Sequence, residues 1–335
     1  MNEVPLTPVG GNDRLTLALR LASEALPRFG IAPDARIDGL PLSENVVLRV
    51  TPPTGAPAVL RISRQGSSTP IEIRSELAWI EALRMQSSAP VPGVLHTVDG
   101  ESVLTLTDEE TGEPASISVF ENVPGHEPAE DELLAVLPRL GRISAELHNH
   151  STHWQRPSWF IRKRWDLEAA FGPNPRWGDW RVGITDPGQR TLIERAERVV
   201  RERLTAFGTG PERFGLIHAD LRTANVLVDG NDIRVIDFDD AGFGWWLYEM
   251  AAALTFYEND PACEAMVEAW IGGYREVRQV SEADVREVPT FLVFRRLLTL
   301  AFLANNPGIQ VSREMLPGLP EQTADLAAAY LARFS

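Results

Sequence analysis

The stretch from Phe214 to Asp240, FGLIHADLRTANVLVDGNDIRVIDFDD, decides the fold of this chain. Its second half contains two short apolar runs on either side of DGND, a turn whose Asp, Gly and Asn accept positive φ. This pattern predicts a β-hairpin. Polar residues with no evident structural need lie on both sides of the hairpin: His218, Asp220, Asn225, Asp237, Asp239 and Asp240.

The ends of the predicted hairpin favour a metal site. The two strands of a tight hairpin lie roughly 5 Å apart, so Asn225 and Asp237 should direct oxygen atoms toward one volume. Mg²⁺ prefers such ligands, and it fills its remaining positions with phosphate oxygens and water. Asp220 lies on the preceding loop, where it can present a carboxylate to a substrate hydroxyl. The arrangement therefore predicts phosphoryl transfer.

Residues 1–121 are predicted to form a small β-rich domain. A helical spacing of leucines follows Asn12 and Asp13, two residues that can cap a helix. Pro70 opens a second amphipathic pattern, and short β-branched runs separated by Pro and Gly predict an antiparallel sheet. The expected helices cover 13–29 and 70–84, and the expected strands cover 46–50, 58–62, 94–98, 102–107 and 116–123.

The segment NVPGHEP, residues 122–128, is the predicted domain boundary, because Pro and Gly interrupt regular structure there. Beyond it the chain becomes helical, and the hairpin is the only strand pair that we expect in residues 122–335. The helical patterns cover 131–151, 191–207, 247–277 and 284–304. The fold class predicted from this order is α+β.

Composition limits the partners of the chain. It has 335 residues, with 32 Lys and Arg against 47 Asp and Glu, for a net charge of -15. This field repels nucleic acid and anionic membrane surfaces, and it attracts a small cationic substrate. Cys263 is the single cysteine and cannot form an internal disulfide.

We expect a cytoplasmic protein with no membrane anchor. The first residues, MNEVPLTPVGG, lack the basic and apolar regions of a secretory signal. The most apolar late segment, residues 291–304, is interrupted by Arg295 and Arg296, and it is shorter than the roughly 20 residues that a bilayer requires. The sequence contains no indication of the oligomeric state.

HADLRTAN at 218–225 and IDFDD at 236–240 resemble the paired motifs of aminoglycoside phosphotransferases, choline kinases and homoserine kinases, which share the protein-kinase fold. The resemblance covers most of the chain. It implies a bilobal fold, with a small antiparallel β-sheet N-lobe that contains one helix and a larger α-rich C-lobe. It also implies that Asp220 is the catalytic base, that Asn225 and Asp237 hold Mg²⁺, and that His218 braces the catalytic loop.

The same resemblance implies ATP as the phosphoryl donor. Arg61 on the AVLRI strand would contact the nucleotide phosphates and pair with Glu76 on the following helix. A lysine is usual at the strand position, but VLRISRQG followed by IRSELAWIEALR resembles a bacterial branch that also has Arg. Arginine keeps the charge, but it is bulkier and offers a planar fork in place of a point charge.

The usual G-x-G-x-x-G loop is absent from the first hairpin. PLSENVVLRV stands in its place, so the phosphates would be approached by Ser43, Glu44 and Asn45. The adenine would be hydrogen-bonded by the backbone at the linker, through Phe120, Glu121 and Val123.

Aromatic residues mark the expected acceptor side. Five of the nine tryptophans lie between Trp154 and Trp180, where they either cover the acceptor and bind a cation or anchor a long loop. Asp239 is a second candidate for the acceptor or the metal. The segment after the DFDD turn lies where the family binds its acceptor. It contains four candidates for substrate contacts or loop support: Trp245, Trp246, Tyr248 and Glu249.

Two other candidate sites are set aside. His148, His150 and His153 do not share a helical face, so we expect structural roles and no zinc site. Cys263 is expected to be a structural thiol.

The predicted activity is ATP- and Mg²⁺-dependent phosphorylation of a small-molecule hydroxyl, on an amino alcohol, an aminoglycoside or a homoserine-like compound. The absence of an A-P-E-like segment after DFDD favours this activity over a bacterial stress-type Ser/Thr protein kinase. A nucleotide-binding pseudokinase is the third alternative, because Arg61 replaces the usual lysine.

Overall fold

The structure is a computed structural model that describes residues 11–40, 45–63, 66, 68–109 and 112–334, with the side chains of 11–14 excepted. The chain forms two compact units. Unit 1 comprises Met1–Met85, Val91–Pro124 and Pro157–Ile161. Unit 2 comprises Gln86–Pro90, Gly125–Arg156 and Arg162–Ser335.

Unit 1 is built on an antiparallel sheet with the order β1-β2-β3-β6-β4, to which β5 adds by pairing with β6. Its strands are β1 Arg36–Gly39, β2 Val46–Thr51, β3 Ala58–Ile62, β4 Val94–Leu95, β5 Leu104–Thr107 and β6 Pro114–Glu121. The predicted hairpin is present, with Leu48 opposite Leu60. Both side chains are fully buried, as the alternation in these strands requires.

Two helices complete unit 1. Helix α1, Gly11–Ala25, continues into a 3₁₀ turn at Leu26–Phe29 and packs its apolar residues onto the sheet. Helix α2, Pro70–Gln86, begins at the predicted proline. The sequence did not indicate β1, because the side chains of RIDG are all exposed or half-buried and show no apolar alternation.

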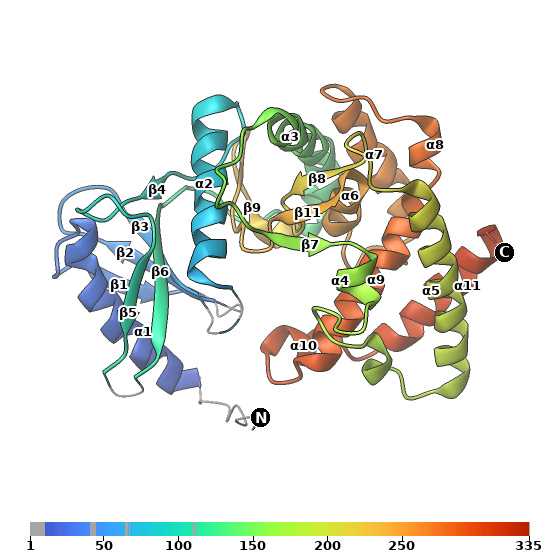
Figure 1. Cartoon of the computed structure of the whole chain (residues 1–335), viewed down its shortest axis with the longest axis horizontal. Helices are drawn as coiled ribbons and strands as arrows, with labels where there is room; N and C mark the ends of the chain where they lie inside the picture. Colours follow the sequence, from blue (N-terminus) through green and yellow to red (C-terminus); the bar gives the residue numbers. More distant parts are fainter. Residues whose placement is uncertain (1–10, 41–44, 64–65, 67, 110–111, 335) are drawn as a thin grey trace. The chain divides into compact units, whose positions relative to one another are not determined.

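Unit 2 is largely helical. Its helices are α3 Leu133–His153, α4 Leu167–Phe171, α5 Pro187–Phe207, α6 Trp246–Ala253, α7 Cys263–Arg275, α8 Glu282–Val285, α9 Val288–Asn305, α10 Gln310–Met315 and α11 Leu319–Phe334. Helix α3 runs beside α7, and α5, α9 and α11 pack together (Figure 1). The predicted mixture of an antiparallel sheet in the N-terminal region and a helix-rich C-terminal part is confirmed.

Glycines allow α3 and α7 to approach closely. A Cβ placed on Gly273 of α7 would lie 1.7 Å from the carbonyl oxygen of Pro138, and one on Gly141 of α3 would lie 2.0 Å from that of Trp270. No side chain fits at either position, so the two backbones are in direct contact. This contact fixes α3, which places His148 beside Glu249 of α6.

Unit 2 contains more strands than we predicted. The hairpin of β9 Val226–Asp229 and β10 Asp232–Val235 is present. A second sheet has the order β7-β11-β8, formed by Lys163–Trp165, Gly242–Trp245 and Phe214–Ile217. The expectation of a single strand pair was wrong because these strands are short and β11 contains two glycines. A Cβ on Gly242 would lie 2.6 Å from the carbonyl oxygen of Lys163, so close pairing excludes the side chains that usually mark a strand.

Helix α9 is a long, strongly apolar helix of unit 2. By length and composition it passes the test for a membrane span, but 78% of that window is buried inside the fold. Both of its arginines, Arg295 and Arg296, are buried as well. These properties are typical of a core helix in a globular domain.

Candidate active site

The loop that follows β8 holds Asp220 in a fixed orientation. Its Oδ1 accepts a hydrogen bond from Arg295 Nη2 at 2.6 Å, and its Oδ2 accepts from Asn225 Nδ2 at 2.8 Å and from Arg222 Nε at 3.3 Å. Burial opposes the charged form of Asp220, but the guanidinium groups of Arg295 and Arg222 outweigh burial and hold the pKa of this carboxyl below its usual value.

The backbone around Asp220 is held in an unusual conformation. Ala219 has a φ of +69° and Asp237 one of +60°, and among the described non-glycine residues only Phe256 shares a positive φ. Glu249, at the start of α6, accepts hydrogen bonds from the backbone N–H groups of His218 and Ala219, at 3.0 and 3.3 Å. Strained backbone persists where its surroundings fix it, and such positions cluster at functional sites.

His218 lies where a brace of the loop is expected. Its Nδ1 accepts from the backbone N–H of Asp220 at 3.3 Å, and its Nε2 is 3.1 Å from the carbonyl oxygen of Ile236. Its ring also packs against Phe238, with the ring centroids 4.5 Å apart. The imidazole thus links the catalytic loop to the segment after β10.

The hairpin brings the two predicted metal ligands near each other. Val226 and Val235 form the last paired positions of β9 and β10, and the N–H of Ile236 then donates to the carbonyl oxygen of Asn225 at 3.0 Å. Asn225 uses its amide nitrogen on Asp220, so Oδ1 is the atom that could bind a metal ion. One amide oxygen and the carboxylate of Asp237 are hard ligands, so the residues present fit Mg²⁺.

Two basic residues hold the DFDD loop: Arg162, just before β7, and Lys163, the first residue of β7. Sequence reasoning did not identify either of them. Arg162 donates to the carbonyl oxygen of Ala241 at 2.5 Å and also to those of Phe238 and Asp239. Lys163, itself buried, contacts the carboxylates of Asp240 at 2.9 Å and of Asp239 at 3.7 Å. The basic run IRKR in the Trp-rich segment was the available signal.

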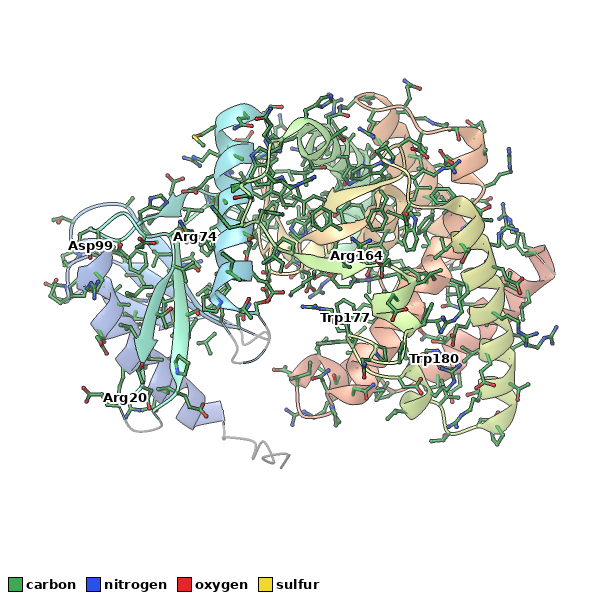
Figure 2. The ribbon with its side chains drawn as sticks, in the orientation of Figure 1. Arg20, Arg74, Asp99, Arg164, Trp177 and Trp180 are labelled. Atoms are coloured by element: carbon green, nitrogen blue, oxygen red, sulfur yellow. The ribbon has the colours of Figure 1, made fainter. Side chains whose placement is uncertain are left out.

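The Trp-rich segment contains both anchors and a more accessible ring. Trp165 is buried, donates to the carbonyl oxygen of Asp240 at 2.8 Å and stacks on Trp177 at a centroid distance of 4.0 Å. Trp180 is also buried and donates to Glu197 at 2.8 Å. Trp177 is half-buried, on the segment that joins α4 to α5 (Figure 2).

The residues after the DFDD turn lie mostly in the core. Trp245 is buried and donates to the carbonyl oxygen of Gly208 at 2.7 Å. Trp246 packs against His148, with the ring centroids 4.6 Å apart. Tyr248 accepts a hydrogen bond from Arg295 Nη1 at 2.8 Å, and burial raises the pKa of its hydroxyl. Of the two roles considered for these residues, the contacts favour loop support.

Glu249 and His148 form a buried titratable pair, with 3.6 Å between Oε2 and Nε2. Burial raises the pKa of Glu249 to about 7. Burial, assisted by the charge of Arg278, lowers the pKa of His148 well below its usual value. Within the described part of the chain, neither Glu249 Oε1 nor His148 Nε2 has a hydrogen-bond partner. Below about pH 7, these shifts favour a state in which both groups are uncharged.

Unit 1 contains the predicted pair of Arg61 and Glu76. The guanidinium binds the carboxylate through two hydrogen bonds, of 2.7 and 2.8 Å, and the two residues are 5% and 0% exposed. Arg61 also lies over the ring of Phe120, 5.3 Å from its centroid. At the position where lysine is usual, arginine thus gives Glu76 two parallel hydrogen bonds.

The remaining nucleotide candidates are distributed over unit 1. Asn45 is buried at the start of β2. Ser43 and Glu44 lie outside the described residues. Glu121 pairs with Arg84 at 2.9 Å, and Val123 is half-buried after β6.

The parts of unit 2 match a recognised class. A loop carboxylate oriented by cationic groups, followed by a hairpin that presents hard oxygen ligands, is the arrangement of a phosphotransferase. In agreement with this class, the profile of the phosphotransferase enzyme family, APH, matches residues 39–282, and the chain belongs to this family.

Known proteins are similar over nearly the whole chain. The structure of a microcompartment-associated aminopropanol kinase has 38% sequence identity and a TM-score of 0.86, over 94% of this chain and 98% of that one. Amicoumacin kinase of Bacillus subtilis is 24% identical over 316 residues, 89% of this chain and 90% of its own length.

The fold also matches more distant kinases. The structure of amicoumacin kinase hAmiN in complex with AMP-PNP, Ca²⁺ and Ami has 19% identity and a TM-score of 0.75, over 94% of this chain and 96% of that one. The predicted family and kinase-like fold are thereby confirmed, and the chain is a phosphotransferase that acts on an alcohol group.

Proposed function

We propose that this chain is an ATP- and Mg²⁺-dependent kinase that transfers the γ-phosphoryl group to the hydroxyl of a small amino alcohol. The observation that carries the proposal is the orientation of Asp220, whose carboxylate is fixed by Arg295, Asn225 and Arg222. The similarity to an aminopropanol kinase at 38% identity supports the choice of acceptor.

Asp220 is the residue that receives the acceptor hydroxyl. Its Oδ1 takes the proton as the hydroxyl oxygen forms its bond to the γ-phosphorus and the bond from that phosphorus to the bridging oxygen of ADP breaks. Because three donors already fix the carboxylate, the hydroxyl meets an oriented acceptor, and most of the rate enhancement comes from positioning.

Asn225 and Asp237 are the residues that would hold Mg²⁺. When bound, the ion neutralises charge on the phosphate oxygens during transfer. Arg162 and Lys163 keep the DFDD loop in place, and His218 and Glu249 keep the catalytic loop in place.

In unit 1, Arg61 binds the nucleotide phosphates, with Glu76 holding its guanidinium in place. The backbone near Phe120, Glu121 and Val123 binds adenine, and Asn45 approaches the phosphates. Arg61 carries the same charge as lysine, so the substitution is compatible with nucleotide binding.

The surroundings of Asp240 favour an acceptor with an amine. Asp240 retains a partly exposed carboxylate beside Lys163, with 32% of its side chain accessible. The stacked rings of Trp165 and Trp177 adjoin it through the hydrogen bond from Trp165 to the Asp240 carbonyl. A carboxylate and the half-buried indole of Trp177 together attract an ammonium group.

The test is a coupled assay of ADP release with ATP and Mg²⁺ and a panel of acceptors: 1-amino-2-propanol, ethanolamine, homoserine, an aminoglycoside and a generic protein. We expect turnover with a small amino alcohol and none with protein. The Asp220→Asn variant should lose about 10²–10⁴-fold in kcat while still binding ATP. Unchanged turnover in this variant, or transfer to protein alone, would contradict the proposal.

A further inference from the structure

A further role for Arg295 extends the proposed function and rests on it. We propose that Arg295 is a positioning residue that fixes the catalytic carboxylate of Asp220 for transfer. It lies in the middle of α9, 75 residues away from Asp220 in the sequence, and its Nη2 is 2.6 Å from Asp220 Oδ1.

Each of the three guanidinium nitrogens of Arg295 has a protein partner. Its Nε donates to Thr255 Oγ1 at 2.9 Å, its Nη1 to Tyr248 Oη at 2.8 Å, and its Nη2 to Asp220. The residue is only 8% exposed. Because its planar fork is fixed on three sides, the guanidinium acts through Asp220 and does not serve as a mobile substrate ligand.

Arg295 fixes the position of Asp220 Oδ1, the carboxylate oxygen that Asn225 and Arg222 do not bind. Asn225 and Arg222 both bind Oδ2, so without Arg295 the described contacts would hold the carboxylate through that oxygen alone. A carboxylate oxygen has two lone pairs, and Oδ1 uses one of them on Arg295. Oδ1 is therefore the oxygen that can receive the acceptor hydroxyl, with Arg295 setting its direction.

Tyr248 and Thr255 in turn hold Arg295. Tyr248 belongs to α6, and Thr255 follows that helix, so the guanidinium ties α9 to α6 and to the catalytic loop. Misplacement of a reacting group by about 1 Å can cost about 10²-fold in rate. Loss of Arg295 should therefore lower kcat with little effect on binding.

The chain offers a matched control in Arg296, the next residue of α9. Arg296 is also buried, but it pairs with Glu258 at 2.5 Å and with Asn259 at 3.0 Å, and Asp220 is not among its partners. The same substitution at the two positions separates the loss of a buried arginine from the loss of the contact to Asp220.

The experiment measures kcat and KM for the amino alcohol, the Kd for ATP and thermal unfolding in wild type, Arg295→Lys, Arg295→Met and Arg296→Lys. We expect kcat to fall about 10²-fold in Arg295→Met and less in Arg295→Lys. KM and the ATP Kd should stay within about threefold of wild type, since the contact acts on orientation. Arg296→Lys should lose thermal stability but keep kcat within the same range.

Chemical rescue gives a second readout. In Arg295→Ala, millimolar guanidinium chloride should restore part of kcat, and it should not do so in Arg296→Ala. If Arg295→Met does not fold, Tyr248→Phe tests the same contact, and we expect it to lower kcat with KM unchanged.

Two results would overturn the proposal: a folded Arg295→Met with kcat within threefold of wild type, or equal kcat losses in Arg295→Lys and Arg296→Lys. If wild type transfers phosphate to no small acceptor, the proposed function fails instead, and ATP hydrolysis to water then serves for the same comparison of variants.

Discussion

The buried carboxylate of Glu76 depends on the guanidinium of Arg61 to compensate its charge. Glu76 is fully buried, and its carboxylate is held by two hydrogen bonds from Arg61. Breaking a buried pair on one side leaves an uncompensated charge, which is far more costly than replacing both partners by apolar residues.

We therefore predict that Arg61→Met lowers the free energy of unfolding by about 3–5 kcal/mol, measured by urea unfolding. Arg61→Lys should lose less, because the charge remains, although the paired hydrogen bonds do not. The control is the double variant Arg61→Met with Glu76→Met, which should recover most of the loss. A loss below about 1 kcal/mol in Arg61→Met would contradict the prediction.

Glu249 and His148 should each make the free energy of unfolding depend on pH, in opposite directions that offset each other in the wild-type protein. The pKa of Glu249 is raised to about 7 from an ordinary value of 4.5, so between these pH values the folded state binds more protons than the unfolded state. Stability due to Glu249 is thus full below about pH 4.5 and falls as the pH rises toward 7.

His148 has the opposite effect. Its pKa is lowered well below 6.5, so below this pH the unfolded state binds more protons and stability falls as the pH decreases. The two contributions overlap and largely cancel between about pH 5 and 6.5.

Single substitutions should separate the two contributions. In Glu249→Gln, the free energy of unfolding should rise as the pH goes from about 5 to 6.5; in His148→Phe it should fall from about pH 5 to 7. Each slope is at most about 1.4 kcal/mol per pH unit. Urea unfolding across this pH range measures the slopes, and wild-type slopes in both variants would be evidence against the pair.

The proximity of several candidate site residues could be predicted from the sequence because they lie in one continuous stretch. Asp220, Asn225 and Asp237 fall within 18 residues, and a hairpin of known spacing joins them. Arg295 and Arg162 could not be predicted, because the loop residues that they hold, Asp220 and Ala241, are more than 70 residues away. Nothing in the local pattern distinguishes a buried arginine that orients a loop from one on the surface of a helix.

At the scale of elements, the contact between α3 and α7 depends on which face of α7 each glycine occupies. Gly272 is exposed, and a Cβ placed on it would meet no atom within 4 Å. Gly273 is buried against α3, where a Cβ would meet the backbone of Pro138 at 1.7 Å. The close packing of α3 and α7 therefore requires glycine at position 273 but not at position 272.

We predict that Gly272→Ala stabilises the protein by about 0.5–1 kcal/mol, because alanine restricts the unfolded chain and favours helix. Gly273→Ala should destabilise it by at least about 1–3 kcal/mol, because the helices must separate. Thermal unfolding of the two variants compares them directly. Equal shifts would show that the two helices do not pack as described.

Elements were predicted where periodicity or turn chemistry was strong. The hairpin of β9 and β10 and the start of α2 at Pro70 are examples. The sheet of β7, β11 and β8 was missed because its strands have three or four residues each and are held by neighbours distant in the sequence. Such strands form through tertiary contacts, which override local preference.

At the scale of the whole molecule, the net charge of -15 affects the two substrates in opposite ways. A cationic amino alcohol is attracted, and the anionic complex of ATP with Mg²⁺ is repelled. Salt screens both effects, since the Debye length falls to about 10 Å at 0.1 M.

We predict that the KM for the amino alcohol rises and the KM for ATP falls when NaCl is increased from about 0.02 to 0.2 M. Steady-state kinetics at constant Mg²⁺ measures both values, and each serves as the control of the other. A change of the same sign in both would indicate a general salt effect on the enzyme and not the field of the protein.

The two arginines of α9 have a consequence before the protein folds. They are the only charged residues of the helix, and each disfavours insertion at a bilayer centre by about 2.5–3.5 kcal/mol. If both arginines were replaced by Met, the nascent chain would present an uninterrupted apolar segment to the translocon as this segment leaves the ribosome. The native pair thus helps this segment to remain in water until the rest of unit 2 surrounds it.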